Sequence, residues 1–84
     1  MSNLESLDGW AVKKGVLKKI YSFEDFGEAI AFVDDVAEIA EEEHHHPDIR
    51  IFSYKNVEIS LTTHGENGLT DKDYRLAAKI DILT

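Results

Sequence analysis

Histidine and acidic residues are the clearest candidates for chemistry in this 84-residue chain. Three consecutive histidines, residues 44–46, follow three glutamates and precede Pro47, while a fourth, His64, lies further along the chain. An imidazole can take up or release a proton near neutral pH, and a neighbouring carboxylate can orient it. The pattern therefore indicates general acid–base catalysis, on condition that the distant histidines share one pocket.

Other interpretations of the histidine run are open. The run can be no more than a polar helix terminus, with His64 an exposed strand end, and spacing alone does not decide between this and a site. A metal site is less favoured, because adjacent side chains rarely point at one ion and the H-E-x-x-H spacing is absent. The absence of cysteine and of a G-x-S-x-G motif disfavours nucleophilic catalysis.

The histidine run follows a predicted helix. Apolar residues recur at spacings of three and four over residues 23–43, and Pro47 prevents the helix from continuing. Residues 22–25 have the S-x-x-D form of a capping box, which predicts Ser22 as the N-cap. The helix should therefore span about residues 23–43 and present the histidines at its exit.

The remaining periodic segments predict four strands and a second helix. The strands are expected over residues 9–12, 16–22, 49–54 and 57–64, with turns at Lys14-Gly15 and Lys55-Asn56. Thr70 and Asp73 form a second capping box, which starts a helix that runs nearly to the C-terminus and gives Asp73 a structural explanation. Trp10 is expected to anchor the core.

This order of elements predicts an α+β fold. The β-β-α-β-β-α sequence favours a four-stranded antiparallel sheet with the helices packed on one face. The length predicts a single domain over residues 1–84, with residues 1–8 as a short helical turn or a frayed end.

The composition of the chain limits the classes of partner that we expect it to bind. The net charge of −8 repels phosphate backbones and anionic lipid, so we expect no nucleic acid and no membrane as partner. Lys13-Lys14 and Lys18-Lys19 are expected at solvent-facing strand ends, with a patch for phosphate or an acidic partner as the alternative. The absence of cysteine, of a long apolar run and of a secretory signal fits a cytoplasmic protein.

Several motifs together resemble the pterin-4a-carbinolamine dehydratase family. They are His45-His46-Pro47, the segment 54–64 that ends in His64, and Gly68-Leu69-Thr70 followed by Asp73 and Leu76-Ala77. Upstream, Gly9-Trp10 and residues 23–41 extend the resemblance, which covers about residues 9–82. Paired histidines before a proline, a third histidine at a strand end and an acid shortly after it form a specific combination.

The resemblance implies an enzyme. Its reaction is the dehydration of 4a-hydroxytetrahydropterin to quinonoid dihydropterin, with the pterin as substrate and with neither a metal nor a cofactor. It also implies a homodimer or homotetramer. The catalytic residues that it implies are His45, His46 and His64, supported by Glu41 and Asp73, and we expect substrate contacts at His44, Pro47, Thr62 and Thr63.

Roles can be assigned to the histidines as a hypothesis. The C4a hydroxyl leaves only when protonated, and the proton on N5 must be removed. We expect His46 and His64 to be the acid–base pair, while His45 holds the pterin ring and Glu41 orients or charges an imidazole. Two further functions stay open. The chain can be a dimerisation cofactor or assembly chaperone, as members of this family also are, or it can act on a different hydroxylated heterocycle.

Overall fold

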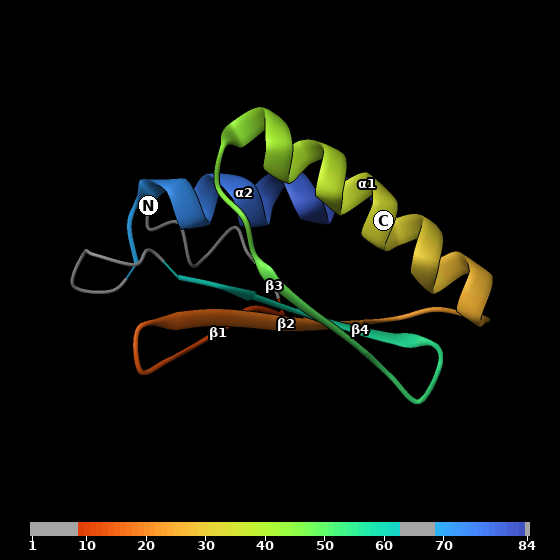
Figure 1. Cartoon of the computed structure of the whole chain (residues 1–84). Coiled ribbons are helices and arrows are strands. Elements are labelled where there is room, and N and C mark those ends of the chain that lie inside the picture. Colours follow the sequence, from red (N-terminus) through yellow and green to blue (C-terminus); the bar gives the residue numbers. More distant parts are fainter. Residues whose placement is uncertain (1–8, 63–68, 84) are drawn as a thin grey trace.

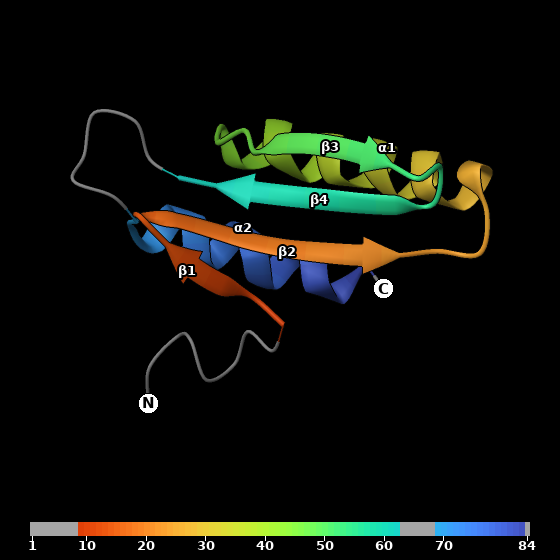
Figure 2. The same cartoon turned by 90° about the horizontal axis from the view of Figure 1, so that it is seen from below.

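Two helices lie on one face of a four-stranded sheet in the computed structural model, which describes residues 9–62 and 69–83 (Figure 1). The elements are β1 (Ala11–Lys13), β2 (Val16–Ser22), α1 (Phe26–Glu43), β3 (Asp48–Phe52), β4 (Asn56–Leu61) and α2 (Asp71–Ile82). The sheet order is β1-β2-β4-β3, and every neighbouring pair is antiparallel (Figure 2). The predicted α+β fold is confirmed. Residues 1–8, Thr63 and His64, on which further predictions fall, lie outside the described residues.

The core lies between the helices and the sheet. Alternate residues of the central strands face the helices, because side chains of a strand point to opposite faces in turn. Trp10 is 8% exposed and belongs to this core, as predicted. Its fully buried aliphatic residues are Leu17, Ala29, Val36, Val57, Ile59, Leu61, Leu76, Ala77 and Ile80.

The first helix begins later than predicted. Its N-cap is Asp25, which accepts the Glu28 backbone N–H at 2.8 Å, while the Glu28 carboxylate accepts the Glu24 backbone N–H at 3.0 Å. The sequence therefore holds two overlapping capping motifs, and the D-x-x-E motif replaces the S-x-x-D motif. Ser22 remains the last residue of β2, where its hydroxyl donates to Asn56 Oδ1 at 2.8 Å.

The β3–β4 turn also differs from the prediction. Positive φ angles occur at Ser53 (50°) and Tyr54 (56°), whereas Asn56 lies in β4 opposite Phe52. Pairing across the sheet decides this, because Asn56 is also opposite Ser22 of β2. By contrast, the predicted turn at Lys14-Gly15 is confirmed, with φ angles of 53° and 76°.

The end of α2 is fixed to the N-terminal half of the sheet through Asp81. Its carboxylate accepts the Trp10 indole N–H at 3.1 and 3.2 Å, the Lys19 ammonium at 2.9 Å and the Tyr21 hydroxyl. Burial, and then the bond to Asp81, raises the pKa of Tyr21. The prediction of a solvent-facing Lys19 is wrong, because Lys19 lies opposite Ile59 on the helix-covered face of the sheet.

Candidate active site

The exit of α1 is formed by a left-handed residue, His44. Its φ of 53° and ψ of 38° turn the chain, and the N–H groups of His44 and His45 reach back to the carbonyls of Glu41 (3.3 Å) and Ala40 (3.2 Å). This is the Schellman arrangement, which usually has glycine at the left-handed position. A non-glycine residue there costs on the order of 1 kcal/mol, so folding stability alone does not favour histidine at this position.

Beyond this turn, His45 contacts a buried carboxylate of α2. His45 Nε2 lies 2.5 Å from Asp73 Oδ1, and the two side chains are 12% and 0% exposed. Asp73 Oδ2 accepts the Thr70 backbone N–H at 3.0 Å, which completes the predicted capping box at the start of α2. A carboxylate can only accept, so His45 Nε2 carries the donated proton and Nδ1 is the basic nitrogen of the neutral ring. Asp73 thus caps a helix and orients an imidazole.

His46 contacts a different acid. Its Nε2 lies 2.8 Å from Glu41 Oε2, and the side chains are 62% and 78% exposed. A contact so open to water contributes little to stability, typically about 0–1 kcal/mol even when both groups are charged. The two adjacent imidazoles therefore differ in their surroundings, since His45 is largely buried and bonded to Asp73 whereas His46 is exposed.

Strand register brings the α1 exit close to the end of β4. Asp48, the first residue of β3, lies opposite Ser60. In an antiparallel pair the residues before Asp48 run beside those that follow Ser60, so His46-Pro47 approaches Thr62. The Thr62 hydroxyl donates to the Gly15 carbonyl at 2.9 Å. His44 is exposed and Pro47 half-buried, while Thr63 and His64 fall outside the described residues.

Two hollows in the described part of the chain lie away from these side chains. One, of about 290 Å³, is lined by residues from the start of α1 and the end of the chain, including Phe23, Phe32 and Leu83. The other, of about 420 Å³, is lined by residues of the β1–β2 region and Glu58. Within residues 9–62 and 69–83, no group of three or more histidine, cysteine and acidic side chains could hold a metal ion. Nor does that part of the chain include a helix long and apolar enough to cross a membrane.

Glu43 is a residue near the site that sequence analysis did not single out. Its carboxylate contacts Lys79 Nζ at 2.5 Å and Arg75 Nη1 at 3.6 Å, and its side chain is 18% exposed. The bond to Lys79, reinforced by Arg75, lowers the pKa of Glu43. The sequence pattern that could have predicted these contacts is the run of three acids at the negative end of a helix dipole. This placement is unfavourable unless cations from another element lie nearby.

Comparison with protein families agrees with the motifs of the sequence. A family model described as pterin 4 alpha carbinolamine dehydratase matches residues 1–83. Two curated relatives carry the provisional name pterin-4-alpha-carbinolamine dehydratase. The one from Sulfurisphaera tokodaii is 45% identical, over 95% of this chain and 85% of its own. The one from Thermomicrobium roseum is 47% identical, over 94% and 84%.

Two solved structures are similar in fold. One is described as a transcriptional coactivator/pterin dehydratase from Brucella melitensis; it superposes with a TM-score of 0.90 at 34% identity and covers 96% of this chain and 87% of its own. The other is described as a pterin dehydratase-like protein that is a RuBisCO assembly factor in the alpha-carboxysome, with a TM-score of 0.72, 29% identity and coverages of 88% and 84%. The fold thus accompanies both an enzymatic and an assembly function.

Proposed function

This chain belongs to the pterin 4 alpha carbinolamine dehydratase family, and we propose that it dehydrates a 4a-hydroxytetrahydropterin to the quinonoid dihydropterin. The observation that carries the proposal is the contact between His45 and the buried Asp73. A buried carboxylate that orients an imidazole is a known arrangement for proton transfer.

The reaction suits histidine because its bond changes are assisted by proton transfer alone. The bond between C4a and its hydroxyl oxygen breaks, the oxygen leaves as water after it gains a proton, and the N5 proton departs as the C4a=N5 double bond forms. One general acid and one general base are required. At the end the acid has given one proton to the departing water, and the base has taken one proton from N5. Imidazole serves either role near neutral pH. Neither a metal nor a cofactor enters the proposal.

We assign a role in this reaction to each predicted site residue. His46, oriented by Glu41, and His64 are the acid–base pair. His45, oriented by Asp73, binds the ring and takes part in the proton transfer. The left-handed turn at the end of α1 and the register of β3 against β4 support this grouping. The remaining substrate contacts that we propose are His44, Pro47, Thr62 and Thr63.

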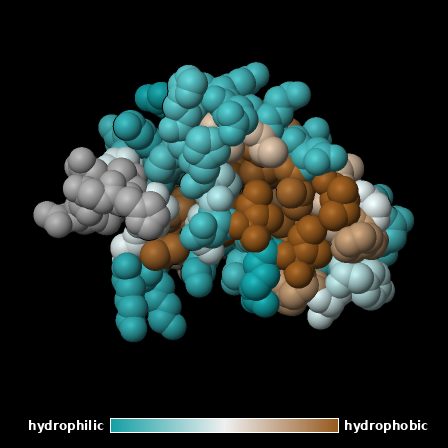
Figure 3. All heavy atoms as spheres, viewed as in Figure 1, coloured by the Kyte–Doolittle hydropathy of each residue, from teal (hydrophilic) through white to brown (hydrophobic). Residues whose placement is uncertain are grey.

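We propose further that the protein is a cytoplasmic homodimer or homotetramer. The support for an assembly is the apolar surface where α1 lies over the edge strand β3 (Figure 3). There Phe26 and Ile30 of α1 are 53% and 37% exposed, and Ile49 and Ile51 of β3 are only partly buried. Large exposed apolar residues grouped along an open strand edge are typical of an interaction surface.

A direct assay tests the enzymatic proposal. The purified chain should accelerate formation of the quinonoid dihydropterin from a 4a-hydroxytetrahydropterin, measured against the spontaneous dehydration. Lys55→Gln is a suitable control variant, because Lys55 is exposed in the β3–β4 turn, at the opposite end of these two strands from Asp48 and Thr62. A rate equal to the spontaneous one at every protein concentration would overturn the proposal.

The second candidate function is a non-catalytic role as a dimerisation cofactor or assembly chaperone. The similarity to a pterin dehydratase-like RuBisCO assembly factor favours it. A chain with this function would bind no pterin and would co-purify with one protein partner. Pterin binding together with turnover decides for the dehydratase.

A further inference from the structure

The acidic end of α1 contains one carboxylate that faces the protein. Glu41, Glu42 and Glu43 form the last turn, where the helix dipole is negative and no basic residue of α1 compensates for it. Glu41 and Glu42 are exposed, whereas Glu43 is turned toward α2 and its side chain is 18% exposed. One of the three acids is therefore held in a defined position.

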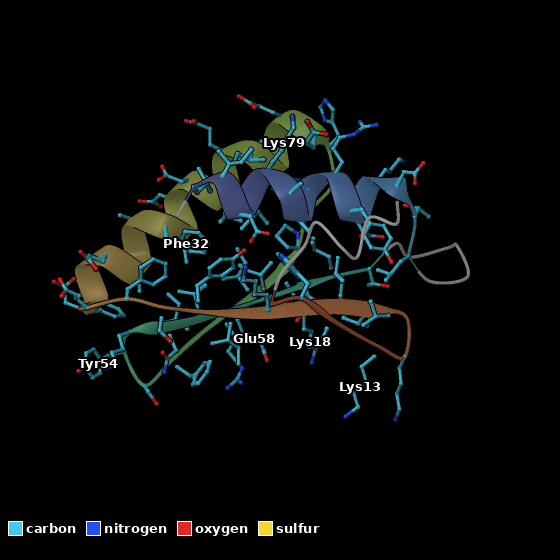
Figure 4. All side chains as sticks on the ribbon, turned by 180° about the vertical axis from the view of Figure 1, so that it is seen from behind. Lys13, Lys18, Phe32, Tyr54, Glu58 and Lys79 are labelled. Atoms are coloured by element: carbon cyan, nitrogen blue, oxygen red, sulfur yellow. The ribbon has the colours of Figure 1, made fainter. Side chains whose placement is uncertain are left out.

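Two cations of α2 hold it. Lys79 Nζ contacts Glu43 Oε2 at 2.5 Å, and Arg75 Nη1 lies 3.6 Å from Glu43 Oε1. Arg75 and Lys79 are four residues apart and so share one side of α2. Figure 4 shows Lys79 on α2 at the level of the C-terminal end of α1. The carboxylate accordingly joins the two helices at this end of the molecule.

A second link between the same two segments lies two residues away. Glu43 is followed by the left-handed His44 and then by His45, whose ring contacts Asp73. Asp73 precedes Arg75 on α2. The α1 exit is thus fixed to α2 at two points, by an ion pair before the turn and by the imidazole–carboxylate contact after it.

We propose that Glu43 is a positioning residue, which sets the distance between His45 and Asp73 through its ion pairs with Lys79 and Arg75. Without these pairs the last turn of α1 loses its ion-pair link to α2, and the left-handed turn that follows can shift relative to α2. Displacement of a catalytic group by about 1 Å can cost on the order of 10²-fold in rate, so a smaller shift of His45 should still be measurable. The catalytic consequence rests on the proposed dehydratase function; the structural one does not.

The test compares Glu43→Gln with Glu42→Gln, which removes the same charge from the same helix end at an exposed position. Nitrogen-15-edited NMR of the folded proteins follows the proton that His45 Nε2 donates to Asp73, assigned by its loss in Asp73→Asn. In Glu42→Gln this proton should keep its shift and its slow exchange with water. In Glu43→Gln it should move upfield and exchange several-fold faster, and Lys79→Met should act in the same direction.

Kinetics then separates the two proposals. Glu43→Gln should lower kcat about tenfold and raise KM as well, because it moves His45, which takes part in proton transfer and also binds the ring. The charge-swapped pair Glu43→Lys with Lys79→Glu should restore part of the loss. An unchanged His45 proton in both Glu43→Gln and Lys79→Met would overturn the positioning role, even if kcat fell. If the His45 proton shifted in Glu43→Gln but the parent protein itself showed no turnover, the positioning role would be supported and the dehydratase function would be refuted.

Discussion

His45 Nε2 lies 2.5 Å from Asp73 Oδ1, although 28 residues separate the two in sequence. The first residue belongs to the exit of α1 and the second to the first turn of α2, so the contact connects two helix ends. Asp73 is fully buried and has both oxygens engaged, one by the imidazole and one by the Thr70 N–H. The ring is therefore held in one orientation, which a proton-transfer group requires.

Asp73→Asn should uncouple this pair while preserving its shape. An amide has one acceptor and one donor end, so it cannot accept from both Thr70 and His45, and the imidazole is driven to the other tautomer. We expect kcat to fall on the order of 10²- to 10⁴-fold and the free energy of unfolding to fall by about 1 kcal/mol through the weakened cap. Steady-state kinetics and chemical denaturation measure the two effects. Asp71→Asn, at an exposed residue of the same turn, is the control and should leave kcat unchanged.

His46→Gln and His64→Gln test the proposed acid–base pair. Each should lower the dehydration rate on the order of 10²-fold or more, because glutamine preserves hydrogen bonding but cannot exchange a proton. The pH–rate profile should lose one limb in each variant, and the lost limb tells the acid from the base. If both variants dehydrated the carbinolamine at the rate of the parent protein, the assignment would be wrong.

Glu41→Gln should have a much smaller effect than Asp73→Asn. The contact between Glu41 and His46 is exposed on both sides, so water screens it and can replace it. We expect a change in kcat of a few-fold and a change in unfolding free energy within about 0.5 kcal/mol. Activity and melting temperature, measured beside those of Asp73→Asn, check this ranking. A loss equal to that of Asp73→Asn would show that the Glu41 carboxylate does more than orient an exposed ring.

Tyr21 should make the protein sensitive to alkaline pH. Its pKa is raised by burial and by the bond to Asp81. The neutral form is thus favoured in the folded state, and this stabilisation is complete below the unfolded pKa of about 10 and is lost as pH rises above it. Denaturation curves at pH 8 to about 11 should show a steeper decline for the parent than for Tyr21→Phe. Parallel declines would contradict the prediction.

The apolar surface at the edge of α1 and β3 should mediate self-association. The parent chain should sediment as a dimer or tetramer at micromolar concentration, and Phe26→Lys together with Ile30→Lys should shift it toward monomer, because charges are costly in an apolar interface. Tyr54→Lys is a control at the β3–β4 turn, where the side chain is 60% exposed. A parent protein that sediments as a monomer would refute the proposed assembly.

The features that depend on neighbouring residues were predicted correctly from the amino-acid sequence. The helix that ends before Pro47, the capping box of Thr70 and Asp73 and the turn at Lys14-Gly15 are all found where they were predicted. Helix periodicity, capping and turn propensity depend on residues a few positions apart, so a short stretch of the amino-acid sequence is enough to predict them. The resemblance to a family added the site residues, though not how they pair.

Tertiary structure decided the choices between local alternatives and all long-range pairs. Sheet pairing holds Ser22 and Asn56 opposite each other, which moves the cap of α1 to Asp25 and the β3–β4 turn upstream of the predicted Lys55-Asn56. Helix packing brings Asp73 to His45, which is 28 residues away in sequence, and Lys79 to Glu43, which is 36 residues away. Such pairs depend on strand register and on how two helices lie on the sheet, which no short stretch of the chain can specify.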